Sequence, residues 1–450
     1  MTIAYIDVAK APVQVPVIDL LGEPQGAAFD FINEQAWIVD KVNPANTMLR
    51  DVGDVLVNPG ASASKLLRRK SGLIESAPWW VNEYDSAGKA MGMRVEGQRT
   101  RLNTNFETLN FSSSGFTTIP NAELSPLGEI KATKLAEIEG VEGVKASVIR
   151  GQGGPDTSQY ETIFAKAAER RYFTIWTVRG SVQGGFVIDL VTGETRRWYI
   201  NSGSQARTPN FPRIELYPAG WVKIDMELLG MSGSDYRIGF STEFGTGLDA
   251  PASYVGVAGA GIYVWGRNNI NDPVPGSIIA SFEGSQATRA ADAPRINRGF
   301  FPYNRNAGTL IVDAMAYDYD SNANNPAFGF YGPGGNPQIM MNKTDGGTNN
   351  STIESIFRTD VNYEFRYLGQ NFAFPVAPAP KKLGLSWDTT SEILASGALG
   401  LAEEFPTVNW TPFDYERLEF RSAHGIMWYR SAVYIPRKLT AAELLARVRA

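Results

Sequence analysis

The sequence predicts a mainly β protein, with an extended N-terminal arm, two tandem antiparallel jelly-roll sandwiches and a short C-terminal helix. Short apolar runs alternate with turn residues along most of the chain, at spacings of roughly eight to fifteen residues. The 45 Gly and 26 Pro follow no Gly-X-Y period, so they indicate many turns between short strands. A chain of 450 residues is also too long for one ordinary core, and we therefore expect two or three domains.

Residues 1–60 are expected to form the N-terminal arm. Pro12, Pro16 and Pro24 fall early in it, and proline cannot donate to a β-ladder, so the segment fits an edge strand or an arm lying on another surface. Residues 29–39 fit either a strand or a short helix, and the pattern does not separate the two.

Residues 61–115 are expected to form a β-rich connector. A basic run, KLLRRK, occupies residues 65–70, and paired tryptophans follow at 79 and 80. A charge run of this length is common on surfaces, so the interpretation favoured here is a solvated strand edge. The alternative is an electrostatic contact with an acidic partner.

Residues 116–296 are expected to form the first jelly roll and its exit linker. Candidate strands lie at 173–180, 184–193, 196–203, 213–230 and 236–244. The turn at 191–194 separates two strong β runs and indicates a hairpin. Residues 160–171 show helical periodicity instead, with three apolar residues on one side, so a helix is the expectation there.

The last strand of this jelly roll is expected at residues 262–265. Because strand side chains alternate, Tyr263 and Trp265 should share one face, and Ile262 and Val264 the other. The chain then runs to residue 296 without a strong strand pattern. A spacer of that length would not stay ordered alone, so we expect packing to hold it and the joint to be stiff.

Residues 297–450 repeat the same pattern and are expected to form the second jelly roll. Candidate strands lie at 308–319, 326–332, 337–347, 351–360, 363–374, 381–388 and 415–422. Thr440 stands three residues before Glu443, which is the spacing of a capping box and predicts a short terminal helix.

Composition excludes several classes of function. The net charge of −5 argues against general binding of nucleic acid, which needs a basic face. The chain has no Cys, which removes disulfides and thiolate chemistry, and His424 is its single histidine. The first residues lack the pattern of a signal peptide, and no apolar window approaches the roughly 18 residues of a membrane span. We therefore expect no membrane insertion.

Four segments resemble parts of tailed-bacteriophage virion proteins or of phage and bacterial surface proteins. Residues 95–103, VEGQRTRLN, are similar to a run "L-x-x-E-x-x-R-T-N-L", with Arg101 where that pattern usually has Asn. Residues 261–266 and 287–292, GIYVWG and ATRAAD, resemble "G-x-Y-I-W-G-A-Q" and "V-T-R-A-A-D" at the end of the domain that follows that run. Residues 439–444, LTAAEL, are similar to the ending of concanavalin-like (laminin-G-like) jelly rolls in phage and bacterial surface proteins.

The resemblance implies a phage virion structural protein, displayed as a tail fibre, a spike or a capsid decoration. It implies a homotrimer that docks on other virion proteins through residues 1–60 and presents its sandwiches to the host surface, with a glycan as the expected ligand. The expected location is the virion, assembled in the host cytoplasm. The alternatives are a purely structural head or collar protein without host contact, and a tail-spike glycan depolymerase.

The carboxylates do not favour an enzyme. A glucanase-like E-x-D-x-x-E spacing is absent, and paired carboxylates are what glycan cleavage requires. Asp225 and Glu227 share one face of a predicted strand, but a solvent-facing pair on a half-exposed sheet is the favoured interpretation. We therefore expect no enzymatic activity.

Two groups of residues are candidates for binding. Oxygen ligands recur at Asp318, Asp320, Asn322 and Asn324, a spacing that can wrap Ca²⁺, although the sequence is not an EF-hand and a polar hairpin loop is the simpler alternative. No cofactor is otherwise required. Aromatic rings stack on sugars, although most strand tryptophans belong to cores or interfaces. The candidate glycan residues are Trp387, Trp410, Trp428, Asn336 and Asn349.

Overall fold

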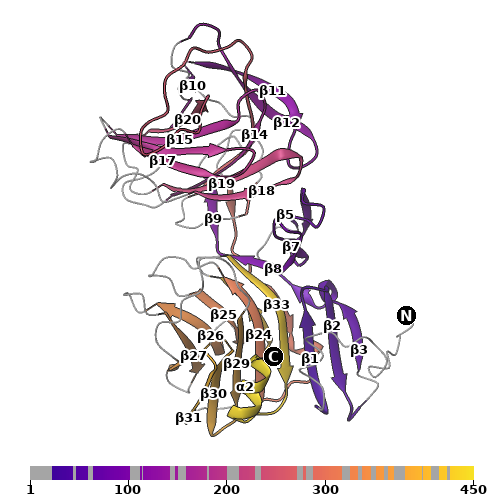
Figure 1. Ribbon diagram of the computed structural model, residues 1–450. Helices are drawn as coiled ribbons and strands as arrows, with labels where there is room; N and C mark the ends of the chain where they lie inside the picture. The colour runs from indigo at the N-terminus through magenta and orange to yellow at the C-terminus, as the bar shows by residue number, and fades with distance from the viewer. Residues whose placement is uncertain are drawn as a thin grey trace.

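The structure is a computed structural model, and it confirms a mainly β protein with one short C-terminal helix (Figure 1). It describes residues 23–43, 47–58, 64–101, 112–113, 115–141, 147–150, 159–179, 182–199, 212–228, 235–270, 277–279, 287–316, 325–332, 337–345, 351–358, 363–368, 381–397, 399–406, 415–422 and 426–449. Figure 1 shows two sandwich lobes, with β5, β7, β8 and β9 between them. None of the helices in the described ranges is long and apolar enough to cross a membrane.

The lobe that holds the C-terminus is a sandwich of two antiparallel sheets. The ten-stranded sheet has the order β3-β2-β1-β33-β24-β29-β30-β31, with β7 and β8 joined through β33. Its strands are β1 (Gln25–Asp30), β2 (Gln35–Asp40), β3 (Met48–Asp51), β7 (Asn82–Tyr84), β8 (Ala90–Glu96), β24 (Gly308–Ala316), β29 (Lys381–Trp387), β30 (Ser391–Ser396), β31 (Leu401–Pro406) and β33 (Ile426–Ile435). The facing sheet has the order β28-β27-β26-β25-β32-β23-β4. Its strands are β4 (Leu56–Val57), β23 (Arg295–Asn297), β25 (Asn325–Tyr331), β26 (Pro337–Asp345), β27 (Ser351–Arg358), β28 (Tyr363–Leu368) and β32 (Arg417–Phe420).

Alternation along β24 explains how this lobe buries both faces of its larger sheet. Leu310 and Val312 point into the core between the sheets, while Ile311 points to the opposite face. Helix α2 (Ala441–Arg449) covers that outer face and packs Leu444 and Val448 on it. The capping box expected at the start of this helix is confirmed, because the Thr440 hydroxyl accepts from the Glu443 amide, and the Glu443 carboxylate accepts from the Thr440 amide.

The described part of the expected N-terminal arm belongs to this same sandwich. β1 pairs with β33 near the C-terminal end of the chain, and Phe29 lies in the core between the sheets. Residues 29–39 therefore form most of a β-hairpin rather than a helix, with Asp30 accepting from the amides of Ile32 and Asn33 in the turn. Pairing of strands some 400 residues apart is set by tertiary packing, which local patterns do not reveal. Residues 1–22 lie outside the described residues.

The other lobe is also a two-sheet antiparallel sandwich; we call it the first sandwich, because it comes earlier in the chain, and the lobe that holds the C-terminus the second sandwich. Its six-stranded sheet has the order β10-β13-β20-β15-β16-β17, and its eight-stranded sheet has the order β11-β12-β21-β14-β19-β18, with β9 joined to β21 and β22 joined to β9. The first sheet contains β10 (Ser112–Ser113), β13 (Ser147–Arg150), β15 (Tyr172–Arg179), β16 (Val182–Asp189), β17 (Thr195–Tyr199) and β20 (Asp235–Ser241). The second contains β9 (Arg99–Arg101), β11 (Phe116–Leu124), β12 (Ile130–Glu137), β14 (Gln159–Ala167), β18 (Arg213–Leu216), β19 (Trp221–Leu228), β21 (Gly261–Ile270) and β22 (Ala287–Arg289). The hairpin expected at 191–194 is confirmed, because β16 pairs with β17 across it.

The helix expected at residues 160–171 is wrong, because this segment holds β14. The strand pairs on both sides, with β19 and β21. Ile163 and Ala165 face the core between the sheets, and Phe164 faces the other side, where it packs on Trp265. Both faces of this central strand are buried, so its apolar residues fall close together and imitate a helical stripe.

The two faces expected for residues 262–265 are confirmed. Ile262 and Val264 lie in the core between the sheets, whereas Tyr263 and Trp265 pack in a separate cluster on the outer face. That cluster also contains Leu66 and Ile74, from the two-stranded sheet of β5 (Ser64–Arg68) and β6 (Ile74–Pro78). The β5–β6 hairpin thus lies on the outer face of this lobe, and Lys65 of β5 also donates to the Arg94 carbonyl of β8 in the second sandwich.

Candidate functional site

The two sandwiches are connected by a very short piece of chain. Strand β8 pairs with β33 in one lobe, and β9 pairs with β21 and β22 in the other. Only Gly97 and Gln98 separate β8 from β9. Strand β22 lies antiparallel to β9, with Arg289 opposite Arg99. Residues 95–101 and 287–292, the described parts of two segments that carry the phage resemblance, therefore meet at the joint, although nearly 200 residues separate them along the chain.

Glu96 is a fully buried anion at this joint. Arg289 Nη2 lies 2.8 Å from its carboxylate, and Arg94 Nε lies 3.4 Å away. The Ser277 amide donates a further hydrogen bond of 2.7 Å to it. Burial alone would raise the pKa of Glu96, but the charges of Arg289, Arg94, Arg99 and Lys65 outweigh this and hold the pKa well below its ordinary value. Glu96 is therefore ionised and held from several directions.

Asp292 is a second buried anion beside it. Its carboxylate lies 2.5 Å from Lys65 Nζ and 3.0 Å from Arg289 Nη1, and it accepts from the Glu96 amide at 2.8 Å. The Asp292 amide donates in turn to the Glu96 carbonyl. We call Lys65, Arg94, Glu96, Arg289 and Asp292 the joint cluster. Breaking one partner of such a buried set costs about 3–5 kcal/mol, because it leaves an uncompensated charge.

A second contact ties the β5–β6 hairpin to the first sandwich. The Arg68 guanidinium stacks 3.7 Å from the centre of the Tyr217 ring, and Arg68 Nη1 lies 3.8 Å from the Glu215 carboxylate. Arg213 and Lys223 also face Glu215. Burial would raise the pKa of Glu215, but the charges of Lys223, Arg213 and Arg68 lower it to about 2.

Within the basic run at 65–70, Lys70 is exposed as expected for a solvated edge, but Lys65 and Arg68 are not. Lys65 and Arg68 are only 5% and 4% exposed, and their acidic partners, Asp292 and Glu215, belong to the same chain. The interpretation of Asp225 as solvent-facing is also wrong. It is fully buried, where Lys223 Nζ lies 2.7 Å from its carboxylate and the Thr162 hydroxyl donates to it. The side chain of Glu227 lies outside the described part of the structure.

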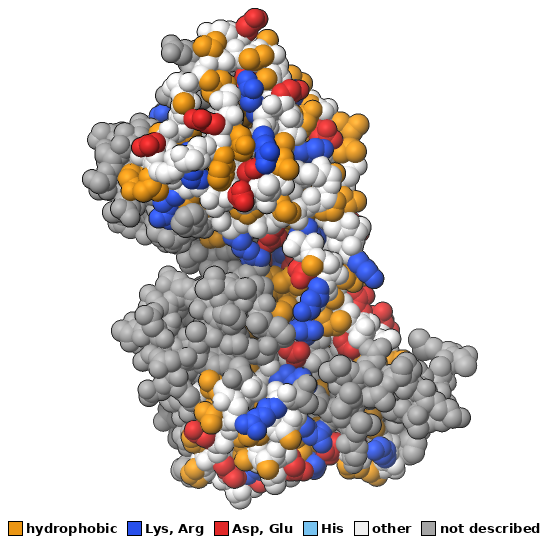
Figure 2. Space-filling view, in the orientation of Figure 1, with side chains coloured by type: hydrophobic (Ala, Val, Ile, Leu, Met, Phe, Trp, Pro, Cys, Tyr) orange, Lys and Arg blue, Asp and Glu red, His pale blue; other side chains and the backbone are white. Residues whose placement is uncertain are grey.

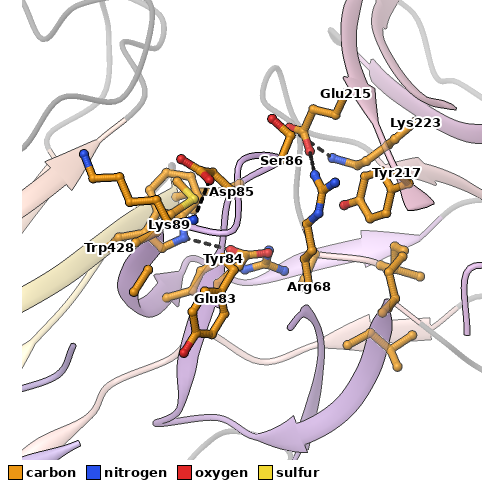
Figure 3. Close-up of a pocket in the computed structure, with 18 of the residues that line it drawn as sticks. Arg68, Glu83, Tyr84, Asp85, Ser86, Lys89, Glu215, Tyr217, Lys223 and Trp428 are labelled. Atoms are coloured by element: carbon orange, nitrogen blue, oxygen red, sulfur yellow. Dashed lines mark hydrogen bonds and ion pairs between the residues drawn. The ribbon is translucent and has the colours of Figure 1, made fainter. Parts of the chain in front are cut away.

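A cavity of about 310 Å³ lies between the lobes, beside the joint cluster (Figure 3). Figure 3 shows Arg68 reaching toward Glu215, with Tyr217 and Lys223 beside it, and Trp428 and Glu83 on the other side. The waist of the molecule carries Lys, Arg, Asp and Glu side chains in the space-filling view (Figure 2). The cavity is lined by Leu66, Arg68, Ile74, Glu83, Tyr84, Asp85, Ser86, Lys89, Ala90, Met91, Arg94, Arg213, Glu215, Tyr217, Lys223, Ser277, Ile278, Met315, Ile426 and Trp428.

Glu83 organises one wall of this cavity. One of its carboxylate oxygens accepts from Arg94 Nη1 at 2.5 Å, and the other accepts from Trp428 Nε1 at 2.7 Å. Trp428 is 3% exposed and packs with Met91 and Met315, which makes this wall apolar. The cavity therefore combines a fixed apolar wall with fixed charges, which is the usual make-up of a small-ligand site.

Of the binding residues predicted from the sequence, only Trp387 and Trp428 lie among the described residues. Trp428 lies in the wall of the cavity, but Trp387 is fully buried in the core against Phe330 and Tyr434, so the assignment of Trp387 to a sugar site is corrected. An indole without an exposed face cannot stack on a sugar. The other candidates lie outside the described residues: Trp410, Asn336, Asn349, Asp318, Asp320, Asn322, Asn324 and His424. Within the described ranges, no group of three His, Cys, Asp or Glu residues is placed to hold a metal ion.

Sequence reasoning did not identify Arg68, Arg94 or Glu215 as site residues. Each lies in an ordinary strand pattern, and only the fold brings the three to one cavity. The segments 95–103 and 287–292, which resemble a known motif, contain Glu96, Arg289 and Asp292 of the joint cluster beside the cavity, but none of the three site residues named above. Such charges are buried only when they find partners.

No protein-family model and no curated protein matches the chain. Among solved structures, the chain is similar over part of its length to the botulinum neurotoxin serotype D binding domain, with 9% identity and a TM-score of 0.27, covering 34% of this chain and 40% of that one. It is also similar to a Ruminococcus gnavus sialidase carbohydrate-binding domain bound to α2,6-sialyllactose, with 11% identity and a TM-score of 0.25, covering 32% and 83%. For an alginate lyase from Pseudomonas aeruginosa the values are 10%, 0.25, 32% and 73%. The chain spans about 40% of the length of the neurotoxin domains, and TM-scores this low do not establish a shared fold.

Proposed function

We propose that the chain is a non-enzymatic structural protein of a tailed-phage virion, displayed as a fibre, spike or decoration, which presents its two sandwiches for adhesion to a host-surface glycan. One observation carries the proposal. Two of the segments that resemble phage virion proteins pair through Arg99–Arg101 and Ala287–Arg289, and they supply Glu96, Arg289 and Asp292 to the joint cluster. The resemblance thus falls on the residues that fix one sandwich to the other.

A stiff joint suits a displayed adhesion protein. Two domains on a free linker sample many orientations, and each binding event must then offset the lost freedom. Here Ile278 and Ile279, the middle of the long exit segment, are buried, and the amide of Ser277 before them is bonded to Glu96. These contacts favour a spacer that is packed along its own chain. Its remaining residues, 271–276 and 280–286, lie outside the described residues.

The carboxylates of the cavity favour binding over catalysis. Both oxygens of Glu83 are engaged by Arg94 and Trp428. Glu215, with its pKa lowered to about 2, stays ionised near neutral pH and is a poor proton donor there. Carboxylates with these partners position other groups rather than exchange protons with a substrate.

Self-association and virion docking are parts of the same proposal. β11 stands at the edge of its sheet and exposes Ile119 and Leu124, 46% and 49% respectively, which offers an unpaired strand edge to a second copy. The homotrimer is proposed on this ground together with the resemblance. Residues 1–60 are the proposed docking segment for other virion proteins, and their strands β1 to β4 also belong to the second sandwich.

Binding of the purified chain to host cells and to their extracted surface polysaccharide tests the proposal, with reducing-sugar release measured in the same samples. We expect retention of the chain on the polysaccharide without new reducing ends. Turnover that disappears in a carboxylate variant would instead favour the depolymerase, and absence of any binding would favour a head or collar protein without host contact.

A further inference from the structure

We propose that the cavity between the lobes binds the carboxylate of an acidic sugar residue, such as a uronate unit of a polysaccharide. This inference rests on the proposed adhesion function and names the chemical class of ligand that this site takes. Three features of the cavity argue for it: unpaired buried donors, an apolar wall, and walls supplied by both lobes.

Two buried guanidinium groups in the cavity have unused donors. Arg94 and Arg68 are 7% and 4% exposed, and both line the cavity. Arg94 Nη2 has no hydrogen-bond partner among the described residues, and neither do Nε and Nη1 of Arg68, although Nη1 faces Glu215 at 3.8 Å. A buried donor without an acceptor costs about 1–3 kcal/mol, so an oxyanion that enters the cavity relieves a cost that the folded chain already carries.

The charges around the cavity are balanced overall. Five basic and three acidic side chains line it, and two buried carboxylates behind the wall, Glu96 and Asp225, pair with Arg94 and Lys223. The acidic side chains that line the cavity already have partners, so they leave the unused donors to a ligand: Glu83 is held by Arg94 and Trp428, Glu215 by its basic neighbours, and Asp85 by the backbone amides of its own turn. Because the walls are partly apolar, a hydrogen bond from such a donor to an oxyanion is stronger there than in open water.

The apolar wall distinguishes a sugar acid from a bare oxyanion. Met91, Met315, Ile426 and Trp428 form one buried cluster, and all four line the cavity. A pyranose ring has a C–H face that packs on such a surface, and its carboxylate projects from the ring edge toward donors. Inorganic phosphate would engage the guanidinium groups but leave the wall uncovered. The volume of about 310 Å³ lies in the range of small-ligand sites.

The two lobes build the cavity together. Glu215 and Tyr217 come from the first sandwich, and Met315, Ile426 and Trp428 come from the second. A ligand that touches both binds only the joined arrangement and therefore stabilises it by mass action. Ligand binding and stiffness of the joint are thus predicted to be coupled.

The test uses the full chain and four probes, namely sodium glucuronate, glucose, sodium acetate and sodium phosphate, with affinity measured by NMR titration. We expect glucuronate to bind at least tenfold more tightly than glucose, acetate or phosphate. Equal affinity for glucuronate and glucose, or for glucuronate and phosphate, would overturn the proposal. So would the absence of glucuronate binding by the folded chain.

Variants place the binding in this cavity. Arg94→Lys keeps a positive charge near Glu83 and Glu96 but loses Nη2, and we expect about a tenfold loss of glucuronate affinity. Lys89→Glu changes an exposed cavity residue without touching the joint cluster, and should weaken glucuronate roughly threefold. Lys41→Glu makes the same charge change on an exposed turn that does not line the cavity, and should have no effect. Unchanged affinity in both Arg94→Lys and Lys89→Glu would overturn the site.

Adhesion to host cells is measured in parallel with the same proteins. Cell binding without glucuronate binding would reject the ligand class and leave the adhesion function standing. Glucuronate binding by a chain that does not bind host cells would support the site and reject the adhesion function.

Discussion

The sandwich cores and the joint between them are held by opposite kinds of chemistry. Each core is an apolar cluster between two sheets, such as the one around Phe330, Trp387 and Tyr434. The joint is a cluster of buried charges, with Glu96 and Asp292 enclosed by Lys65 and arginines. Apolar burial is strong but not directional, whereas buried ion pairs are costly unless their geometry is met. The apolar cores therefore stabilise each lobe, and the buried charges fix the orientation of one lobe relative to the other.

The largest effect is expected from a core variant. Phe330→Ala removes a fully buried ring that stacks on Tyr415 at 5.3 Å between centroids, and should lower the free energy of unfolding by about 3–5 kcal/mol. Denaturant titration followed by tryptophan fluorescence measures it. Leu401→Ala, at a side chain 45% exposed, is the matched control and should change the free energy by less than about 0.5 kcal/mol. Equal effects of the two would contradict the described core.

A joint variant should have a comparable cost but a different location. Asp292→Ala removes the carboxylate that pairs with the buried Lys65 and leaves Arg289 with Glu96 alone, at a cost of about 3–5 kcal/mol. Hydrogen exchange should show lost protection at the Glu96 amide, which donates to Asp292, and retained protection in β24. Asp54→Ala, at an exposed position, serves as the control. Loss of protection throughout β24 would refute the separation between core and joint.

Acid should loosen the contact between the β5–β6 hairpin and the first sandwich. The pKa of Glu215 is lowered to about 2 from an ordinary value of 4.5. Its contribution is therefore fully present above about pH 4.5 and is lost as the pH falls toward 2. Glu215→Gln should be less stable than the parent chain at neutral pH, and the difference should shrink through that window. A difference that stays constant down to pH 2 would contradict the assigned ion pairs.

The smallest effect is expected at the terminal helix, far from both core and joint. Thr440→Ala removes the capping hydroxyl of α2 and should cost about 1 kcal/mol, seen as faster hydrogen exchange in the first turn. Thr440→Ser keeps the hydroxyl and should restore most of the protection. Identical exchange in the alanine and serine variants would show that the cap contributes nothing.

Local patterns predicted elements well and partners poorly. The strand faces at residues 262–265, the hairpin at 191–194 and the capping box at Thr440 depend on neighbours in the sequence, and all three are confirmed. The helix expected at residues 160–171 is wrong because β14 is buried on both faces, and a strand buried on both faces does not show the alternation of apolar and polar residues.

The candidate site was harder to predict because it depends on distant partners. Lys65 and Asp292 are 227 residues apart in the chain, and each alone is typical of a surface residue. The aromatic ring of Trp428 makes it a candidate from the sequence, but its place in the cavity wall depends on a hydrogen bond to Glu83, 345 residues away. No local rule contains that information, whereas the motif resemblance of 95–103 and 287–292 pointed to the right region without revealing its chemistry.

A stiff joint should hold the two lobes at one separation, and a distance distribution between the lobes measures this. The chain has no native cysteine, so Glu194→Cys and Thr389→Cys, both at exposed positions and one in each lobe, can be spin-labelled cleanly for pulsed electron resonance. A single narrow distance peak is predicted at neutral pH, and Asp292→Ala should broaden it. A broad distribution in the chain with an intact joint cluster would contradict the account.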